Sequence, residues 1–254
     1  MDSEKQALQL QKRLQEMADK SYTQNMFTFT GFLGMAEQAE FWKIERQIAH
    51  VGYVLNGGRE GAERQMVRFG KVEELGYEVP FPIRCLHIEP LMRKFAEKLT
   101  HRDFLGALMN LGIERSTLGD IIVGEKEAYL FCVDTMAQYI CDNLTQIRHT
   151  HVTCTITENY EELLQEEPEV RNVQVASMRV DAVIAKVYNK SRNECLELFR
   201  TGKVFVDGRL CENNARILKG GEVINARGFG KFQLTGEVKE TRKGKLSVTV
   251  AVFR

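Results

Sequence analysis

Lys and Arg residues are concentrated in the last third of the chain, from position 179 onward. Clustered side chains of this type can bind a polyanion. This segment holds sixteen Lys and Arg residues against eight Asp and Glu residues, a net charge of +8. Since the whole chain has 35 residues of each sign, the preceding part carries 19 basic and 27 acidic side chains, a net charge of −8. A basic unit binds a polyphosphate by releasing its counterions. The charge pattern therefore predicts nucleic-acid binding in the C-terminal unit.

Two short helices are predicted to position the first of these cations. The apolar residues over 179–188 follow the i, i+3, i+4, i+7 spacing of one face of an amphipathic helix; they are Val180, Val183, Ile184 and Val187. Ser191 and Glu194 have the spacing of a capping box, which predicts the start of a second helix. Gly202 is expected to end that helix in a left-handed conformation.

The start of the second predicted helix combines two features that attract phosphate. Helix N-termini favour anions, and Lys190 and Arg192 flank the capping Ser191. A single surface Lys is ordinarily only solvated by water. A net charge of +8 on one small module, however, causes repulsion among its cations unless a bound polyanion neutralises them. We therefore predict that Lys190, Ser191 and Arg192 anchor a nucleic-acid backbone.

Further cations are predicted to lie on hairpins. Asp207-Gly208 is a preferred pair for a type I′ turn, and residues 217–224 supply another turn and strand. Apolar and polar residues alternate over 231–238 and 246–253. This pattern predicts the two strands of a terminal hairpin, with a basic tip over 240–245. Two interpretations of the tip weigh equally: it contacts phosphate, or it protects an edge strand from pairing with neighbours.

Residues 80–157 are predicted to form a central domain of β-α-β-β-α-β order. Strands are expected over 81–88, 119–123, 128–133 and 149–156, and helices over 91–111, interrupted at Thr100 and His101, and over 135–147. This is the ferredoxin-like order that RNA-recognition (RRM) domains also use. The aromatic RRM motif is missing, and the third strand offers only Tyr129 and Phe131 on one face. We predict that both pack under the two helices.

One stretch of the central domain supplies a second tier of candidate RNA contacts. Residues 99–115 mix cations with a turn that is expected to be exposed. The candidates are His101, Arg102 and Arg115.

The segments on either side of the central domain differ in character. Residues 1–79 are predicted to form a helical N-terminal domain, with helices over 5–20 and 36–51. Its glycine-rich loop over 56–61 lacks the Walker Lys-Ser/Thr pair and follows no clear strand, so we interpret it as a plain turn and not as a nucleotide site. Residues 158–176, which are rich in acids and interrupted by a proline, are interpreted as a linker.

The remaining reactive residue types form no pattern that indicates a metal site, a cofactor site or a catalytic centre. The six cysteines lie apart without a C-x-x-C pair, which indicates reduced structural thiols. His149 and His151 form the only close histidine pair and lack a third ligand. Asp103 and Asp120 have no nucleophile beside them. No apolar run is long enough for a membrane span and no signal peptide is evident, so we expect a cytoplasmic protein without cofactor, metal or membrane contact.

The basic unit resembles the S4 RNA-binding domain. The resemblance rests on R-V-D-x(9)-S-R from Arg179, on L-F-R-T-G-K-V-F-V-D-G from Leu198 and on L-K-G-G-E-V-I from Leu218. The rest of the chain is similar to the bacterial YlmH proteins over 57–64, 102–113, 118–123 and 227–232. The similarity runs nearly end to end. It implies an α+β chain with a helical N-terminal domain, a central RRM-like domain and a C-terminal S4 domain over 177–254 that has an αL-like helical pair and a terminal hairpin.

The resemblance also implies which residues contact RNA. Carried onto this sequence, the S4 contact surface comprises the capping serine and nine cations: Arg179, Lys190, Ser191, Arg192, Arg200, Lys203, Arg216, Lys219, Arg227 and Lys231. The implied partners are structured RNA of the large ribosomal subunit and tRNA, with no DNA. The implied role lies in ribosome-associated quality control of stalled translation. An older link to cell division rests only on which genes are neighbours in the genome.

Three hypotheses follow from these patterns. The first is a non-catalytic RNA-binding factor that grips folded RNA by its phosphates. The second is an RNA-modifying enzyme, because S4 units are often joined to such enzymes, but neither a synthase domain nor a glycine-rich cofactor loop after a strand is present. The third, compatible with the first, makes the acidic N-terminal two-thirds a protein-interaction module that the S4 domain tethers to RNA.

Overall fold

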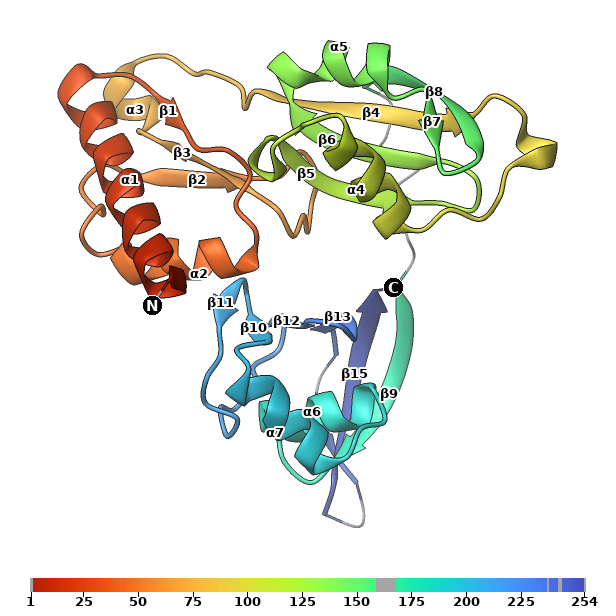
Figure 1. Cartoon of the computed structure of the whole chain (residues 1–254). Coiled ribbons are helices and arrows are strands. Elements are labelled where there is room, and N and C mark those ends of the chain that lie inside the picture. Colours follow the sequence, from red (N-terminus) through yellow and green to blue (C-terminus); the bar gives the residue numbers. More distant parts are fainter. Residues whose placement is uncertain (1, 159–167, 237, 242–243, 254) are drawn as a thin grey trace. The chain divides into compact units, whose positions relative to one another are not determined.

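The chain folds into two compact units, Met1–Gln165 and Glu166–Arg254. The computed structural model describes residues 2–158, 168–236, 238–241 and 244–253 (Figure 1). Helices and strands are mixed throughout, as the sequence predicts. None of the described helices is both long and apolar enough to cross a membrane.

The N-terminal part of the first unit contains the predicted helices and also a small sheet. The helices are α1 (Asp2–Gln24), α2 (Met35–Ile44) and the short α3 (Val72–Leu75). The sheet has the antiparallel order β1-β3-β2, with β1 (Thr28–Phe29), β2 (Tyr53–Asn56) and β3 (Met66–Phe69). These strands are not predictable from the sequence, because runs of two to four residues carry no readable period. The core of this part forms where α1 and α2 pack on the sheet through Leu14, Phe41 and Phe69 (Figure 1).

The central part of the first unit has the predicted β-α-β-β-α-β order. Its elements are β4 (Ile83–Pro90), α4 (His101–Asn110), β5 (Leu118–Val123), β6 (Ala128–Val133), α5 (Asp134–Asn143) and β8 (Thr150–Thr157), with short additions η1 (Arg93–Phe95), η2 (Arg115–Thr117) and β7 (Gln146–Ile147). The strands form an antiparallel sheet of order β5-β6-β4-β8-β7, which is the ferredoxin-like arrangement. Thr100 caps α4 in a capping box with Asp103, so the predicted interruption marks the start of this helix.

The two faces of the central sheet are covered by different parts of the unit. Leu130 of β6 belongs to the core cluster that contains residues of α4 and α5. Tyr129 and Phe131 belong to another cluster, together with Phe32 and Met66 of the N-terminal part. The prediction that Tyr129 and Phe131 pack under the helices is therefore wrong: since Leu130 points toward the helices, the period of two turns its neighbours to the opposite face.

This shared packing joins the N-terminal and central parts into one compact unit. Phe32 and Phe131 are both fully buried, and they come from either side of the domain boundary predicted at residues 79 and 80. The N-terminal part covers a portion of the sheet face on which RRM domains stack bases. The aromatic side chains of β6 are therefore core residues and not a nucleic-acid platform.

The second unit packs two helices on a seven-stranded sheet. The helices are α6 (Val180–Val187) and α7 (Arg192–Arg200). The strands are β9 (Glu169–Val175), β10 (Val204–Val206), β11 (Arg209–Leu210), β12 (Val223–Ala226), β13 (Gly230–Leu234), β14 (Lys239–Glu240) and β15 (Leu246–Phe253). Their order is β11-β10-β12-β13-β15-β14, and β9 pairs with β15. The predicted hairpins at Asp207-Gly208 and at the C-terminal end are present.

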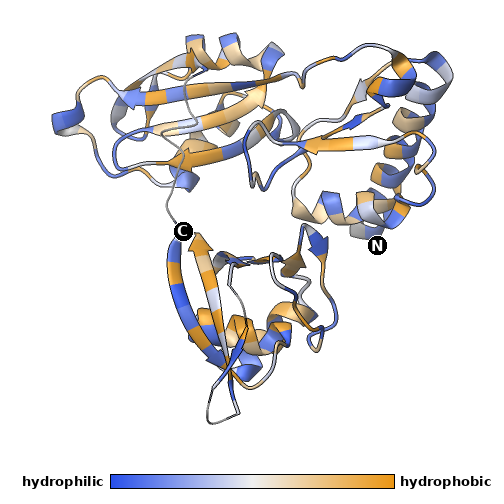
Figure 2. Cartoon of the chain, turned by 180° about the vertical axis from the view of Figure 1, so that it is seen from behind, coloured by the Kyte–Doolittle hydropathy of each residue, from blue (hydrophilic) through white to orange (hydrophobic). Residues whose placement is uncertain are grey.

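Strand β9 corrects the prediction of a linker over 158–176. It pairs antiparallel with β15, from Glu169 opposite Val252 to Val175 opposite Leu246. Figure 2 shows apolar and polar residues alternating along these long strands, and Val175 is only 2% exposed. The linker prediction rested on the acidic residues of this segment. Residues 159–167 of the acidic run lie outside the described part of the chain.

Candidate nucleic-acid interface

The basic unit is built on α6 and α7, which form as the sequence predicts. The four apolar residues of the α6 stripe are at most 4% exposed. At the start of α7, the Ser191 Oγ accepts a hydrogen bond from the Glu194 amide at 3.3 Å, and the Ser191 amide donates to the Glu194 carboxylate at 2.8 Å. Gly202 follows α7 with a left-handed φ of +60°. The predicted capping box and helix end are both confirmed.

The turn between the helices holds Lys190 in place. Asn189 adopts a left-handed φ of +51°, and the Lys190 amide donates to the Ala185 carbonyl at 2.8 Å. The Lys190 ammonium lies 3.4 Å from the Glu194 carboxylate and 4.8 Å from the centre of the Phe229 ring. Backbone hydrogen bonds and an aromatic neighbour thus fix this cation beside the start of α7.

Five of the predicted RNA contacts lie along α7 and the turns next to it, and we call them the cationic strip: Lys190, Arg192, Arg200, Lys203 and Arg227. Arg192 and Arg200 are the first and last residues of α7. The Arg227 amide donates to the Lys203 carbonyl at 2.9 Å, so the β12–β13 turn meets the C-terminal end of α7. All members except the half-buried Lys190 are exposed.

The described residues offer the members of the cationic strip few acidic partners. Arg200 lies 3.8 Å from Glu197 in an exposed pair, a contact that contributes little in water. Arg192, Lys203 and Arg227 form no ion pair with any residue that the structure describes. Three cations are therefore available to a phosphate without first breaking a contact.

Three other predicted contacts form a separate group near the start of α6: Arg179, Arg216 and Lys219. The Val180 amide donates to the Arg216 carbonyl at 2.9 Å, which brings the first two together. Arg179 binds Asp181 through two hydrogen bonds, and Arg216 lies 2.8 Å from Glu222. Lys219 is exposed in the turn before β12. Two of these three cations thus have structural partners within the unit.

The acids beside these cations are held in their ionised forms. The pKa of Glu194 is lowered because its carboxylate accepts hydrogen bonds from Ser191 and lies near Lys190. Burial alone would raise the pKa of Asp181, but the hydrogen bonds and charge of Arg179 outweigh that effect and lower it. Both carboxylates therefore stay negative at neutral pH and organise the basic surface from within.

The last predicted contact, Lys231, and one aromatic residue complete this surface. The Lys231 ammonium lies 4.8 Å from the centre of the Phe253 ring. Phe229 lies between Gly228 and Gly230 in the β12–β13 turn and is 38% exposed. Phe229 was not among the predicted contacts, although an aromatic residue between two glycines and two cations is a readable signal in the sequence.

The second-tier candidates of the central part occupy different surroundings. His101 and Arg102 are the first two residues of α4 and are exposed. Partial burial and the nearby charge of Arg115 lower the pKa of His101, so the imidazole is mostly neutral at neutral pH. Of these two residues, Arg102 is therefore the cation that this helix end offers to RNA.

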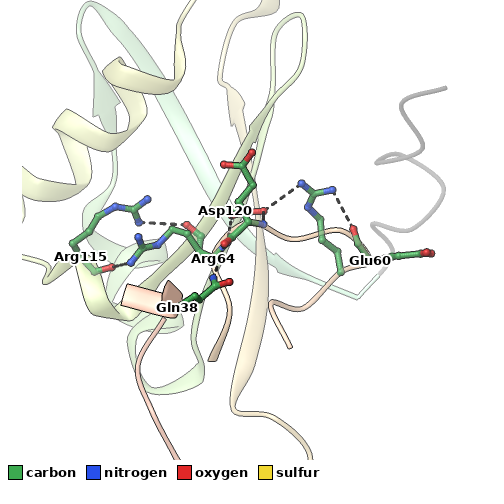
Figure 3. A network of polar contacts seen from close by, with 8 residues as sticks. Gln38, Glu60, Arg64, Arg115 and Asp120 are labelled. Atoms are coloured by element: carbon green, nitrogen blue, oxygen red, sulfur yellow. Dashed lines mark hydrogen bonds and ion pairs between the residues drawn. The ribbon is translucent and has the colours of Figure 1, made fainter. Parts of the chain in front are cut away.

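The third of these candidates, Arg115, is part of a polar network between the N-terminal and central parts (Figure 3). Its guanidinium donates to the carbonyls of Leu118 at 3.0 Å and Gly119 at 3.3 Å. Arg64 donates to the carbonyl of Arg115 itself at 3.0 Å. Burial, reinforced by the charge of Arg64, lowers the pKa of Arg115 to about 10. Its geometry is that of a structural cation, which makes it the weakest of the three candidates.

Asp120 lies at the centre of this network (Figure 3). Its carboxylate accepts hydrogen bonds from the amides of Glu63 and Arg64, both at 2.9 Å, and from the Arg59 guanidinium at 3.3 Å. Asp120 therefore pins the loop between β2 and β3 to the central sheet. That loop does follow a strand, which corrects one argument from the sequence, but it leads into β3 and not into a helix. It consequently lacks the strand–loop–helix context of a phosphate loop.

The cysteines and histidines form no metal-binding cluster in the described chain. All six cysteines are free thiols, and the two closest, Cys141 and Cys154, have sulfurs 3.5 Å apart. His149 and His151 are exposed at the start of β8. The described residues include no cluster of three or more His, Cys, Asp or Glu that could hold a metal ion.

Comparison with protein families identifies two domains that match this architecture. Residues 178–224 match the S4 domain family, and residues 78–161 match the family described as "Putative RNA-binding domain in YlmH". The helical pair and the first match show that residues 178–224 form an S4 domain, a type of RNA-binding domain. With the second match, the chain resembles the YlmH-type proteins in both its central and its C-terminal domain.

Two individual proteins are similar to this chain, one in sequence and one in fold. The chain is 29% identical over 248 residues to the ribosome-associated protein quality control protein P2 of Bacillus subtilis strain 168, an alignment that covers 96% of this chain and 91% of the relative. A solved structure of the cell division protein ylmH from Streptococcus pneumoniae is similar in fold, with a TM-score of 0.50 and 23% identity. It covers 62% of this chain and 93% of the solved one.

Proposed function

We propose that this protein is a non-catalytic RNA-binding factor that grips structured RNA through the cationic strip of its S4 domain. The observation that carries the proposal is the set of exposed cations on α7 and its flanking turns, three of which have no ion-pair partner in the described chain. Unpartnered cations bind phosphates without losing an internal contact. One of them, Arg192, also lies at the N-terminus of α7, which itself favours anions. The folded RNA is recognised by its shape and its phosphates.

We further propose that the RNA belongs to the large ribosomal subunit, with tRNA as an additional contact, and that the protein acts on stalled translation. The support is the Bacillus subtilis relative, whose name places it in ribosome-associated protein quality control, and the match that extends over 96% of this chain. Since ribosomes are cytoplasmic, this proposal also places the protein in the cytoplasm.

The chemistry of the thiols supports a role without catalysis. Burial raises the pKa of each of the six cysteines, so no thiol is activated as a nucleophile at neutral pH. Asp120, the most buried of the described carboxylates in the first unit, binds the loop amides of Glu63 and Arg64 and the Arg59 guanidinium. Neither the thiols nor Asp120 is therefore prepared to act as a nucleophile.

The test measures binding of the full chain to purified large ribosomal subunits over a salt series. If about five phosphates are neutralised, log K falls against log salt with a slope of about 3.5 to 4.5. Charge reversal of Lys190, Arg192, Arg200 and Lys203 is expected to abolish this binding. The matched control reverses four exposed cations of the first unit, Lys5, Arg13, Lys20 and Arg46, and retains it.

Each contrary outcome has a definite meaning. Equal binding by the wild type and the strip variant would move the site to the first unit. A slope near zero, or no binding by the wild type, would overturn the proposal. Loss of an RNA modification when the protein is deleted from cells would favour an enzyme instead.

A further inference from the structure

An exposed aromatic side chain lies at the edge of the cationic strip. Phe229 projects from the β12–β13 turn, two residues after Arg227 and two before Lys231, and it is 38% exposed. This large apolar side chain lies directly beside the strip cation Lys190 and close in sequence to the strip cation Arg227. Single exposed apolar side chains are common on protein surfaces. Phe229 differs from the usual case because the strip cation Lys190 lies over its ring and a turn with two glycines holds it.

The turn fixes the orientation of the ring. Gly228 and Gly230 adopt left-handed φ values of +91° and +123°, which no other residue adopts without strain. The Phe229 amide donates to the Ala226 carbonyl at 2.9 Å, and the ring lies 6.0 Å from the ring of Tyr188. The turn hydrogen bond and the neighbouring Tyr188 ring therefore orient the aromatic surface before a ligand binds to it.

A cation lies next to the ring. The Lys190 ammonium is 4.8 Å from the ring centre, within the range of a cation–π interaction. A nucleotide whose base stacks on Phe229 would have its phosphate within reach of Lys190 and Arg227. Aromatic surface for the base and charge for the phosphate are the two components with which proteins bind unpaired nucleotides.

We propose that Phe229 is a base-stacking residue, and that the S4 face binds an unpaired or extruded nucleotide of its RNA in addition to backbone phosphates. This inference rests on the proposed function and specifies it: the bound RNA element has at least one base out of the helix. Phosphate contacts alone carry no information about pairing, whereas stacking on Phe229 requires an accessible base.

The first experiment compares substitutions at position 229 in binding to large ribosomal subunits. Phe229→Leu keeps the apolar volume but removes the aromatic face, and we expect binding that is about five- to a hundredfold weaker with an unchanged salt slope. Phe229→Trp keeps an aromatic face and should bind as tightly as the wild type. Val170→Ala, at an apolar position 64% exposed on β9, is the matched control and should leave binding unchanged.

The second experiment observes the stack directly. The chain has a single tryptophan, Trp42, so a Trp42→Phe, Phe229→Trp double variant reports only on position 229. Single-stranded oligoadenylate at low salt should quench its fluorescence, while a blunt RNA duplex should quench it far less. Thermal unfolding of each variant confirms that the unit stays folded.

The outcomes separate this inference from the proposed function. If the strip variant loses subunit binding while Phe229→Leu binds like the wild type, the protein binds RNA but Phe229 does not stack, and the inference is overturned. If Phe229→Leu and Phe229→Trp weaken binding equally, the side chain acts by its shape and the inference is again overturned. If the wild type does not bind at all, the proposed function itself fails.

Discussion

Arg179 and Asp181 form a two-bond ion pair at the start of α6. The Arg179 Nε and Nη2 atoms donate to the two Asp181 carboxylate oxygens at 3.0 and 2.6 Å. Asp181 is only 4% exposed, and it also accepts a hydrogen bond from the Asn214 side chain at 3.0 Å. The aspartate of the R-V-D motif thus ties the start of α6 to the loop before β12, and Arg179 holds its carboxylate in place, whatever contact the arginine makes with RNA.

We predict that Asp181→Asn lowers the free energy of unfolding by about 1.5 to 3 kcal/mol, because hydrogen bonds of a buried charged group are lost. Arg179→Gln should also lower it. Urea denaturation followed by circular dichroism measures both effects. Arg192→Gln is the control, since Arg192 is exposed and has no ion-pair partner in the described chain. Equal stability of Asp181→Asn and the wild type would show that this pair does not hold the fold.

The same pair predicts how stability depends on pH. The folded state lowers the pKa of Asp181 below its unfolded value of about 3.9. Its stabilisation is therefore fully present above that value and is lost as the pH falls through the lower, folded pKa. The difference in unfolding free energy between wild type and Asp181→Asn should be constant from neutral pH to about pH 5 and should shrink below about pH 4. A difference that grows on acidification would contradict the assignment.

Single neutralisations should separate cations that bind RNA from cations that hold the fold. Arg192→Gln, Lys203→Gln and Arg227→Gln should each reduce the salt slope of subunit binding by about 0.7 to 0.9, one phosphate contact each, without changing thermal stability. Arg216→Gln breaks the contact with Glu222 at 2.8 Å and should lower stability more than it lowers the slope. The reverse pattern would place the interface around Arg216 and away from the strip.

The sequence predicted the basic unit well because its signals are local. The capping box of Ser191 and Glu194 and the end of α7 at Gly202 each depend on residues within a few positions of one another. The central domain was also predictable, since its strands and helices have readable periods and lengths.

Other features depend on contacts between distant segments. The burial of Phe131 under Phe32 joins residues nearly a hundred positions apart, so the period of β6 alone could not show which side the N-terminal part covers. β9 is positioned by its pairing with β15. Its mixed composition and the adjacent acidic run prevented its recognition as a strand from the sequence. The hydrogen bonds of the Arg115 guanidinium to carbonyl oxygens likewise became visible only in the folded structure.

Asp120 provides a test of how the first unit is held together. Asp120→Asn removes the charge that faces Arg59 and Arg64 and places an amide donor opposite a backbone donor, so unfolding should require about 2 to 4 kcal/mol less free energy. Chemical denaturation of the full chain measures this change. Asp19→Asn, an exposed position on α1, is the control and should leave stability unchanged. An equally stable Asp120→Asn variant would mean that the loop between β2 and β3 is held by other contacts.

Thiol reactivity tests the structural role assigned to the cysteines. Five of the six side chains are buried and Cys141 is half-buried, and burial raises the pKa of Cys85 and of Cys132 to about 12. At pH 8 these thiols are almost wholly protonated and shielded, so iodoacetamide should modify the native chain slowly, and Cys141 first. All six should react rapidly in urea. An Asn193→Cys variant, at an exposed position on α7, should gain one rapidly reacting thiol and thereby confirm that the reagent is active. Rapid native modification at Cys85 or Cys132 would show that the central sheet opens far more often than its packing implies.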